Sequence, residues 1–128
     1  MSNLVSVIIV AFNRDKLLFR LIQSIMSQSF HNLEIIVIDD CSATNIFTQI
    51  KASFTNIKII SCNRRFGPAF SKNLGVLKAK GKYILFLDTD IEIVDKDMIK
   101  KMVNIVEHNE LIGQVGGELS IHNNTHCG

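Results

Sequence analysis

The sequence lacks several features that would assign it to a common functional class. No apolar run reaches the roughly 18 residues that a membrane-spanning helix requires. The formal net charge is only +2, which gives no argument for binding nucleic acid or an anionic membrane surface. The chain has no G-x-S-x-G, no phosphate-loop lysine motif and no G-x-G-x-x-G after its first apolar run. These absences disfavour serine hydrolases, phosphate-loop NTPases and dinucleotide oxidoreductases.

Cysteine is also scarce. The three cysteines (Cys41, Cys62 and Cys127) are an odd number with no paired-ligand spacing, so neither a disulfide framework nor a zinc site is indicated. We therefore expect reduced thiols in a cytoplasmic protein, with peripheral association at the inner face of a membrane left open. A chain of 128 residues is expected to form one domain.

Apolar runs alternate with amphipathic segments along the chain. The runs at residues 4–11, 33–38, 57–61 and 83–87 resemble buried strands, and residues 115–121 are a further candidate. Helices are predicted at residues 15–28, through Ile46 and Ile50, from Pro68 onward, and after Asp95 as the N-cap. This alternation indicates an α/β fold in which helices cover both faces of a mostly parallel sheet.

The predicted helices carry apolar stripes at the spacing of one helix face. The stripe residues are Leu18, Leu21, Ile22 and Ile25 in the first helix, Phe70, Leu74 and Leu77 in the third, and Ile99, Met102, Val103 and Val106 in the fourth. Gly75 interrupts the third helix at a cost of about 1 kcal/mol relative to alanine, which suggests close packing or close approach of a ligand.

Two acidic pairs stand where predicted strands end. Asp39 and Asp40 follow the second run, and Asp88 and Asp90 follow the fourth. Open α/β sheets bind ligands at this edge, so we expect a site for a metal ion and a nucleotide. Mg²⁺ binds through one or two carboxylates together with waters and phosphates, so one of Asp88 and Asp90 would suffice as a direct ligand. A polar turn that ends the strand explains the same tripeptide equally well.

The acidic pair at 39–40 and the segment at 63–75 each allow two interpretations. A carboxylate can accept a hydrogen bond from N3–H of uracil or thymine or N1–H of guanine, but not from adenine N1. Alternatively, the pair caps a helix that starts near residues 41–42, where Ser42 is a good N-cap. Residues 63–75 combine cations, glycines and a helix start that could hold a diphosphate. Arg64 and Arg65 are otherwise solvated loop charges.

Four segments, at residues 5–13, 36–42, 63–75 and 83–90, occur in an order that resembles the nucleotide-sugar-binding half of family 2 glycosyltransferases. The resemblance covers the chain up to about residue 119 and implies the Rossmann-like GT-A fold. It further implies a nucleotide-diphosphate sugar donor, usually UDP-linked, a divalent cation (Mg²⁺ or Mn²⁺), and a saccharide or other hydroxyl acceptor. Transfer in glycan or polysaccharide biosynthesis, without a nucleic-acid partner, is the expected role.

The same resemblance suggests roles for individual residues. It implies that Ala11 and Phe12 line the base pocket, and that Asp40 reads the base with Asp39 beside it. Lys72 would lie near the diphosphate. Asp88 and Asp90 would form the D-x-D motif, in which Asp90 is the better candidate for the direct metal ligand. Arg65 departs from the family pattern, which often has glycine at this position. The larger, charged side chain could either add a contact to a phosphate or narrow the loop.

A second departure concerns the catalytic base. In inverting members of the family, a carboxylate from a second, acceptor-binding half activates the attacking hydroxyl, and Glu118 does not match that motif. We therefore expect residues 1–128 to be a donor-binding domain that is truncated before the acceptor half and contains no catalytic base. The alternatives are a non-catalytic nucleotide-sugar-binding fragment and a receiver-like phospho-acceptor module. The latter is weakened because Phe12 and Asn13, not an acidic pair, follow the first strand.

Overall fold

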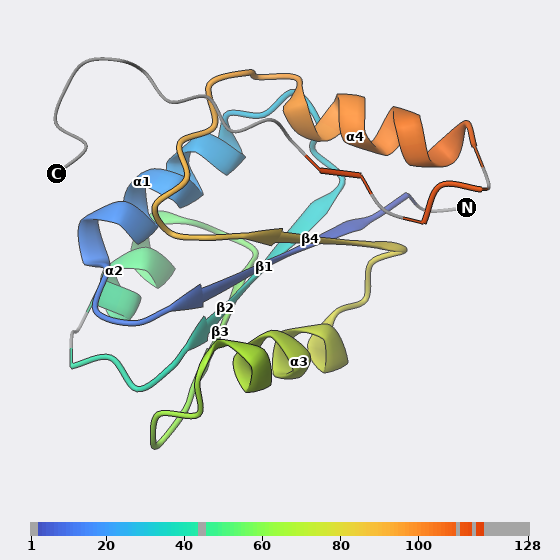
Figure 1. Cartoon of the computed structure of the whole chain (residues 1–128). Helices are drawn as coiled ribbons and strands as arrows, with labels where there is room; N and C mark the ends of the chain where they lie inside the picture. Colours follow the sequence, from blue (N-terminus) through green and yellow to red (C-terminus); the bar gives the residue numbers. More distant parts are fainter. Residues whose placement is uncertain (1–2, 44–45, 110, 114, 117–128) are drawn as a thin grey trace, which may run out of the picture.

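Strands and helices alternate throughout the part of the chain that the computed structural model describes, which is residues 3–43, 46–109, 111–113 and 115–116. The elements are β1 (Val5–Ala11), α1 (Asp15–Met26), β2 (Leu33–Asp39), α2 (Ile46–Ser53), β3 (Ile57–Ser61), α3 (Pro68–Lys78), β4 (Tyr83–Leu87) and α4 (Met98–Glu107) (Figure 1). The strand expected at 115–121 lies mostly outside the described residues. None of the described helices is long and apolar enough to cross a membrane.

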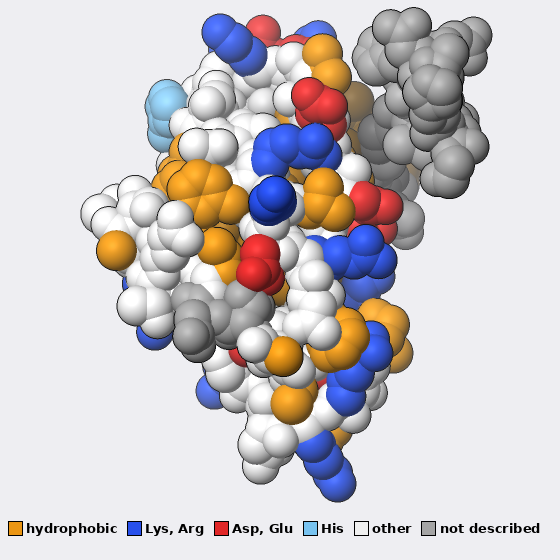
Figure 2. Space-filling view, turned by 90° about the vertical axis from the view of Figure 1, so that its left-hand side faces the viewer, with side chains coloured by type: hydrophobic (Ala, Val, Ile, Leu, Met, Phe, Trp, Pro, Cys, Tyr) orange, Lys and Arg blue, Asp and Glu red, His pale blue; other side chains and the backbone are white. Residues whose placement is uncertain are grey.

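The strands form one parallel sheet in the order β3-β2-β1-β4. β1 lies between two partners, because Ile9 is in register with Val37 of β2 and with Leu87 of β4. All four strands therefore end at the same edge, on the left of Figure 1, and Figure 2 faces this edge. The predicted α/β fold is confirmed.

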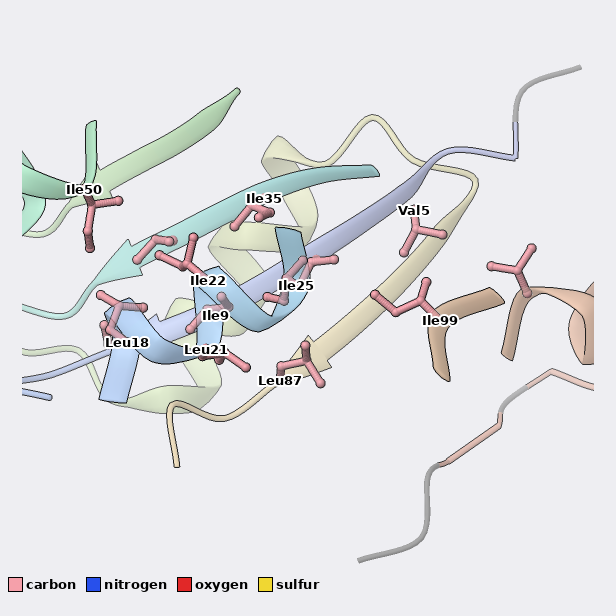
Figure 3. Close-up of a cluster of buried hydrophobic side chains, with 14 residues drawn as sticks. Val5, Ile9, Leu18, Leu21, Ile22, Ile25, Ile35, Ile50, Leu87 and Ile99 are labelled. Carbon is pink, nitrogen blue, oxygen red and sulfur yellow. The ribbon is translucent and has the colours of Figure 1, made fainter. Parts of the chain in front are cut away.

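The main core lies between the sheet and helices α1, α2 and α4 (Figure 3). Alternate residues of β1 and β2 point into it, as the two-residue repeat of a strand requires. The predicted stripe of α1 is confirmed, because each of its members is no more than 1% exposed: Leu18, Leu21, Ile22 and Ile25. Helix α1 therefore packs this face firmly against the sheet.

Helix α3 covers the opposite face, and it packs differently from the prediction. Phe70 and Leu77 are 48% and 81% exposed, whereas Ser71 and Gly75 are buried. The predicted apolar stripe is wrong because α3 approaches β1 through its glycine. A Cβ atom at Gly75 would lie 2.5 Å from Cγ2 of Ile8, so the expected close packing at Gly75 is confirmed.

Helix α4 begins two residues later than predicted, with Asp97 as its N-cap. Asp95 instead accepts a hydrogen bond from the Asp97 amide at 2.9 Å and pairs with Lys101. The side chain of Gln28, which is 2% exposed, accepts from the Ile99 amide at 3.1 Å and donates to the carbonyl of Asp95 at 2.8 Å. Gln28 thus satisfies a first-turn amide of α4, a task that a cap side chain usually performs.

A polar network joins β1 and β2 to the α3–β4 connection. Oε1 of Glu34 accepts from the Ser6 hydroxyl at 2.6 Å and from the Lys80 amide at 2.7 Å. The Gly81 amide donates to the same Ser6 hydroxyl. Desolvation alone would raise the pKa of Glu34, but these hydrogen bonds and nearby lysines outweigh it, so the pKa lies below its ordinary value of 4.5.

Candidate functional site

The acidic residues that follow β2 and β4 share one edge of the sheet. Ala11 is in register with Asp39, and Ile9 with Leu87, so Asp40 and Asp88 leave the sheet on either side of the end of β1. Since β1 separates β2 from β4 and adjacent strands are spaced by 4.7–4.9 Å, the two strands that carry these residues lie about 10 Å apart. Figure 2 shows acidic, basic and hydrophobic side chains interspersed on this face.

Asp40 anchors the loop between β3 and α3. Its carboxylate accepts hydrogen bonds from the amides of Phe66 at 2.8 Å and Gly67 at 3.1 Å, while its own amide donates to the carbonyl of Ala11. Gly67 has a φ of +88°, a conformation that side-chain-bearing residues rarely adopt. Asp40 is only 1% exposed, so in this conformation its carboxylate oxygens bind the loop amides and are shielded from solvent.

Asp39 and Asn13 hold the turns that follow β2 and β1. Asp39 accepts a hydrogen bond from the amide of Ser42 at 2.8 Å, and the Ser42 hydroxyl accepts one from the amide of Asn13 at 3.0 Å. Asn13 in turn accepts from the amide of Ala43. Ser42 therefore joins two turns, and the next helix in the described residues is α2, beginning at Ile46. Residues 41–43 are not helical, so in the part of the chain that the structure describes no helix starts near 41–42.

Phe12 and Asp40 are connected through Arg65. The guanidinium carbon of Arg65 lies 3.6 Å from the centroid of the Phe12 ring, and its Nε lies 3.6 Å from Oδ2 of Asp40. The Arg65 side chain is 56% exposed, whereas that of Asp40 is 2% exposed. One cation thus covers the ring that was expected to face the base.

The start of α3 brings more cations and rings to this edge. The Arg64 guanidinium lies over the ring of Phe66, which stacks on Phe70 at 4.4 Å. The ammonium of Lys72 is 5.7 Å from the ring centroid of Phe86 in β4. Because Phe86 is the second-last residue of β4, Lys72 lies near the end of this strand, after which Asp88 follows.

Asp88 and Asp90 form an exposed turn at the end of β4. The amide of Ile91 donates to the carbonyl of Asp88 at 3.1 Å, and Thr89 between the two acids is buried. Among the described residues, no three histidine, cysteine or acidic side chains are grouped to hold a metal ion. The pair nevertheless suits Mg²⁺ or Mn²⁺, which use one or two carboxylates and take their other ligands from phosphates and water.

Ala11 and Cys62 contribute to the site without presenting reactive groups. Ala11 is 2% exposed, and its backbone carbonyl accepts a hydrogen bond from the Asp40 amide at 2.9 Å. The Cys62 amide donates to the carbonyl of Asp39. Burial, together with the negative charges of Asp40 and Asp39, raises the pKa of the Cys62 thiol, which argues against a nucleophilic role.

Sequence reasoning missed two features of this edge. The contact between Arg65 and Phe12 joins residues from distant loops, and no local pattern predicts it. Asn13 has a φ of 52°; asparagine after a strand was a usable signal, because it tolerates the left-handed conformation better than most residues.

The sequence model described as glycosyl transferase family 2 matches residues 6–122. The chain belongs to this family. It is 32% identical to the glycosyltransferase GlyG of Streptococcus pneumoniae over 113 residues, or 86% of this chain and 37% of that protein. It is also 37% identical to an uncharacterized glycosyltransferase of Haemophilus influenzae over 128 residues, or 98% of this chain and 39% of that protein. The chain thus spans less than half the length of either relative.

Solved structures share the fold of this family 2 chain. S. aureus TarS, residues 1–349, in complex with UDP-GlcNAc, matches with a TM-score of 0.75 and 25% identity, over 83% of this chain and 32% of that one. The mannosyltransferase PcManGT from Pyrobaculum calidifontis, in complex with GDP-Man and Mn²⁺, matches with a TM-score of 0.74 and 21% identity, over 80% and 32%. The second likeness concerns the fold alone.

Proposed function

We propose that residues 1–128 form the donor-binding half of an inverting glycosyltransferase that uses a nucleotide-diphosphate sugar, most simply a UDP-sugar. The observation that carries this proposal is the convergence of Phe12, Asp40 and the Asp88–Asp90 turn on the ends of three adjacent strands. The UDP-GlcNAc complex of TarS supports the choice of donor class.

The proposed roles follow from the chemistry of each group. Phe12 offers a ring on which a base can stack, and Asp40 a carboxylate suited to an imide N–H. Lys72 and the start of α3 provide positive charge for a diphosphate. A divalent cation at Asp90, with Asp88 beside it, would neutralise charge on the leaving diphosphate.

Transfer joins the acceptor oxygen to the anomeric carbon and breaks the bond from that carbon to the diphosphate oxygen. The bond electrons leave with the nucleoside diphosphate, and the hydroxyl proton goes to a carboxylate base. We assign that base and acceptor binding to a part of the enzyme outside residues 1–128. A chain that covers 37% and 39% of two relatives supports this division. The cytoplasm is the proposed location.

Isothermal titration calorimetry with UDP, with and without Mn²⁺, tests the donor site. We expect binding that Mn²⁺ strengthens, and an Asp90→Ala variant that loses the Mn²⁺-dependent gain. Glu107→Ala is the matched control, because it removes one acid at the last residue of α4, on the side where the strands begin (Figure 1). A folded wild type that binds no UDP under either condition would refute the donor site.

A further inference from the structure

Arg65 occupies a position that the proposed donor would need. Its guanidinium lies 3.6 Å from the centroid of the Phe12 ring and so covers a ring face on which a nucleobase could stack. The same side chain is 3.6 Å from Asp40, the carboxylate proposed to read the base. Two recognition elements are therefore already engaged by one residue of the chain.

The loop that carries Arg65 also closes access to Asp40. Both oxygens of Asp40 accept amides of that loop, from Phe66 and Gly67, and the residue is 1% exposed. A base cannot reach this carboxylate while the loop and the Arg65 side chain remain in place. Of Arg65, Phe66 and Gly67, Arg65 is the most readily displaced, since its side chain is 56% exposed and its Nε lies 3.6 Å from Oδ2 of Asp40, beyond the usual length of a charge-assisted hydrogen bond.

We propose that Arg65 competes with the nucleobase for Phe12 and Asp40, and so sets the affinity and base selectivity of the donor site. This inference rests on the proposed function. The planar guanidinium mimics the base in two ways, since it stacks on an aromatic ring and places an N–H group beside a carboxylate. Nucleotide binding then requires Arg65 to withdraw together with the loop that carries it, which frees the Phe12 ring face and the Asp40 carboxylate for the base and leaves the cation near the diphosphate.

The competition predicts an unusual sign for a substitution. Removing a cation from a site for an anionic ligand normally weakens binding, but Arg65→Ala should tighten it. If the open arrangement is populated to about one part in ten, the variant gains about tenfold in UDP affinity, because apparent affinity scales with the binding-competent fraction. Arg65→Lys keeps the charge but loses the planar stacking group, so it should tighten binding too.

Calorimetry with UDP at fixed Mn²⁺ compares these variants with wild type and with Arg64→Ala. The last variant removes the same charge from the neighbouring residue, whose guanidinium lies over Phe66 and not over Phe12, and it should give no tightening. Side-chain NMR gives a second measurement. The Arg65 signals should carry a ring-current shift from Phe12 in the free protein and lose it at saturating UDP.

The outcomes separate the two proposals. Wild type that binds UDP while Arg65→Ala binds equally or more weakly would overturn the competition and leave the donor site standing. A ring-current shift on Arg65 that persists at UDP saturation would do the same. If folded wild type and Arg65→Ala both fail to bind, the proposed function falls, and the competition falls with it.

Discussion

Replacing Gly75 with alanine tests how α3 is seated on the sheet. In an exposed helix this change would stabilise the protein by about 1 kcal/mol through helix propensity. Here the new Cβ would meet Cγ2 of Ile8 at 2.5 Å and Cδ1 at 3.3 Å. Cγ2 is attached directly to the Cβ atom of a buried residue in the central strand, so it cannot move aside. Overpacking of this kind costs about 1–3 kcal/mol.

We therefore expect Gly75→Ala to lower the free energy of unfolding by about 1–2 kcal/mol, measured by urea denaturation. Ile8→Ala removes Cγ2 and should reduce the cost of the glycine change, with a coupling of at least about 1 kcal/mol in a double-mutant cycle. Ile8→Val is the matched control, because it retains Cγ2 and removes only the more distant Cδ1. A Gly75→Ala protein that is more stable than wild type, or a cycle without coupling, would contradict the packing described here.

Two further predictions concern polar groups away from the site. Gln28→Met keeps the length of the side chain but leaves the Ile99 amide without its partner and removes one of the two hydrogen bonds to the Asp95 carbonyl, which also accepts from the Met98 amide, so we expect a loss of about 1–3 kcal/mol in urea unfolding; an unchanged midpoint would show that these hydrogen bonds are dispensable. Because the pKa of Glu34 is lower in the folded chain than its ordinary 4.5, its stabilisation should be complete above that value and disappear as pH falls through the folded pKa. The stability difference between wild type and Glu34→Gln should therefore shrink as the pH is lowered below 4.5, and a constant difference would exclude this linkage.

The spacing of apolar residues predicted the fold, and the acidic residues after two of the predicted strands indicated the edge of the sheet at which they lie. The stripe of α1 was readable because four large apolar residues recur at helical spacing and all are buried. The buried stripe predicted for α3 was wrong. This helix packs closely on β1 at Gly75, which has no side chain, and a pattern of apolar residues does not indicate such a contact. The contact of Arg65 with Phe12 was beyond sequence reasoning, since it depends on how two loops from non-adjacent segments meet in space.

The central position of β1 has a consequence for folding. It pairs with β2, the next strand in the sequence, and with β4, which follows two strands later. The groups at the ends of β1 and β4 therefore come together only after a long segment of chain has closed, and such non-local contacts form slowly. A donor held there would stabilise the assembled sheet and no partly assembled form. Thermal stabilisation by nucleotide would then report the completeness of the domain, and a preparation in which β4 had detached would give no such response.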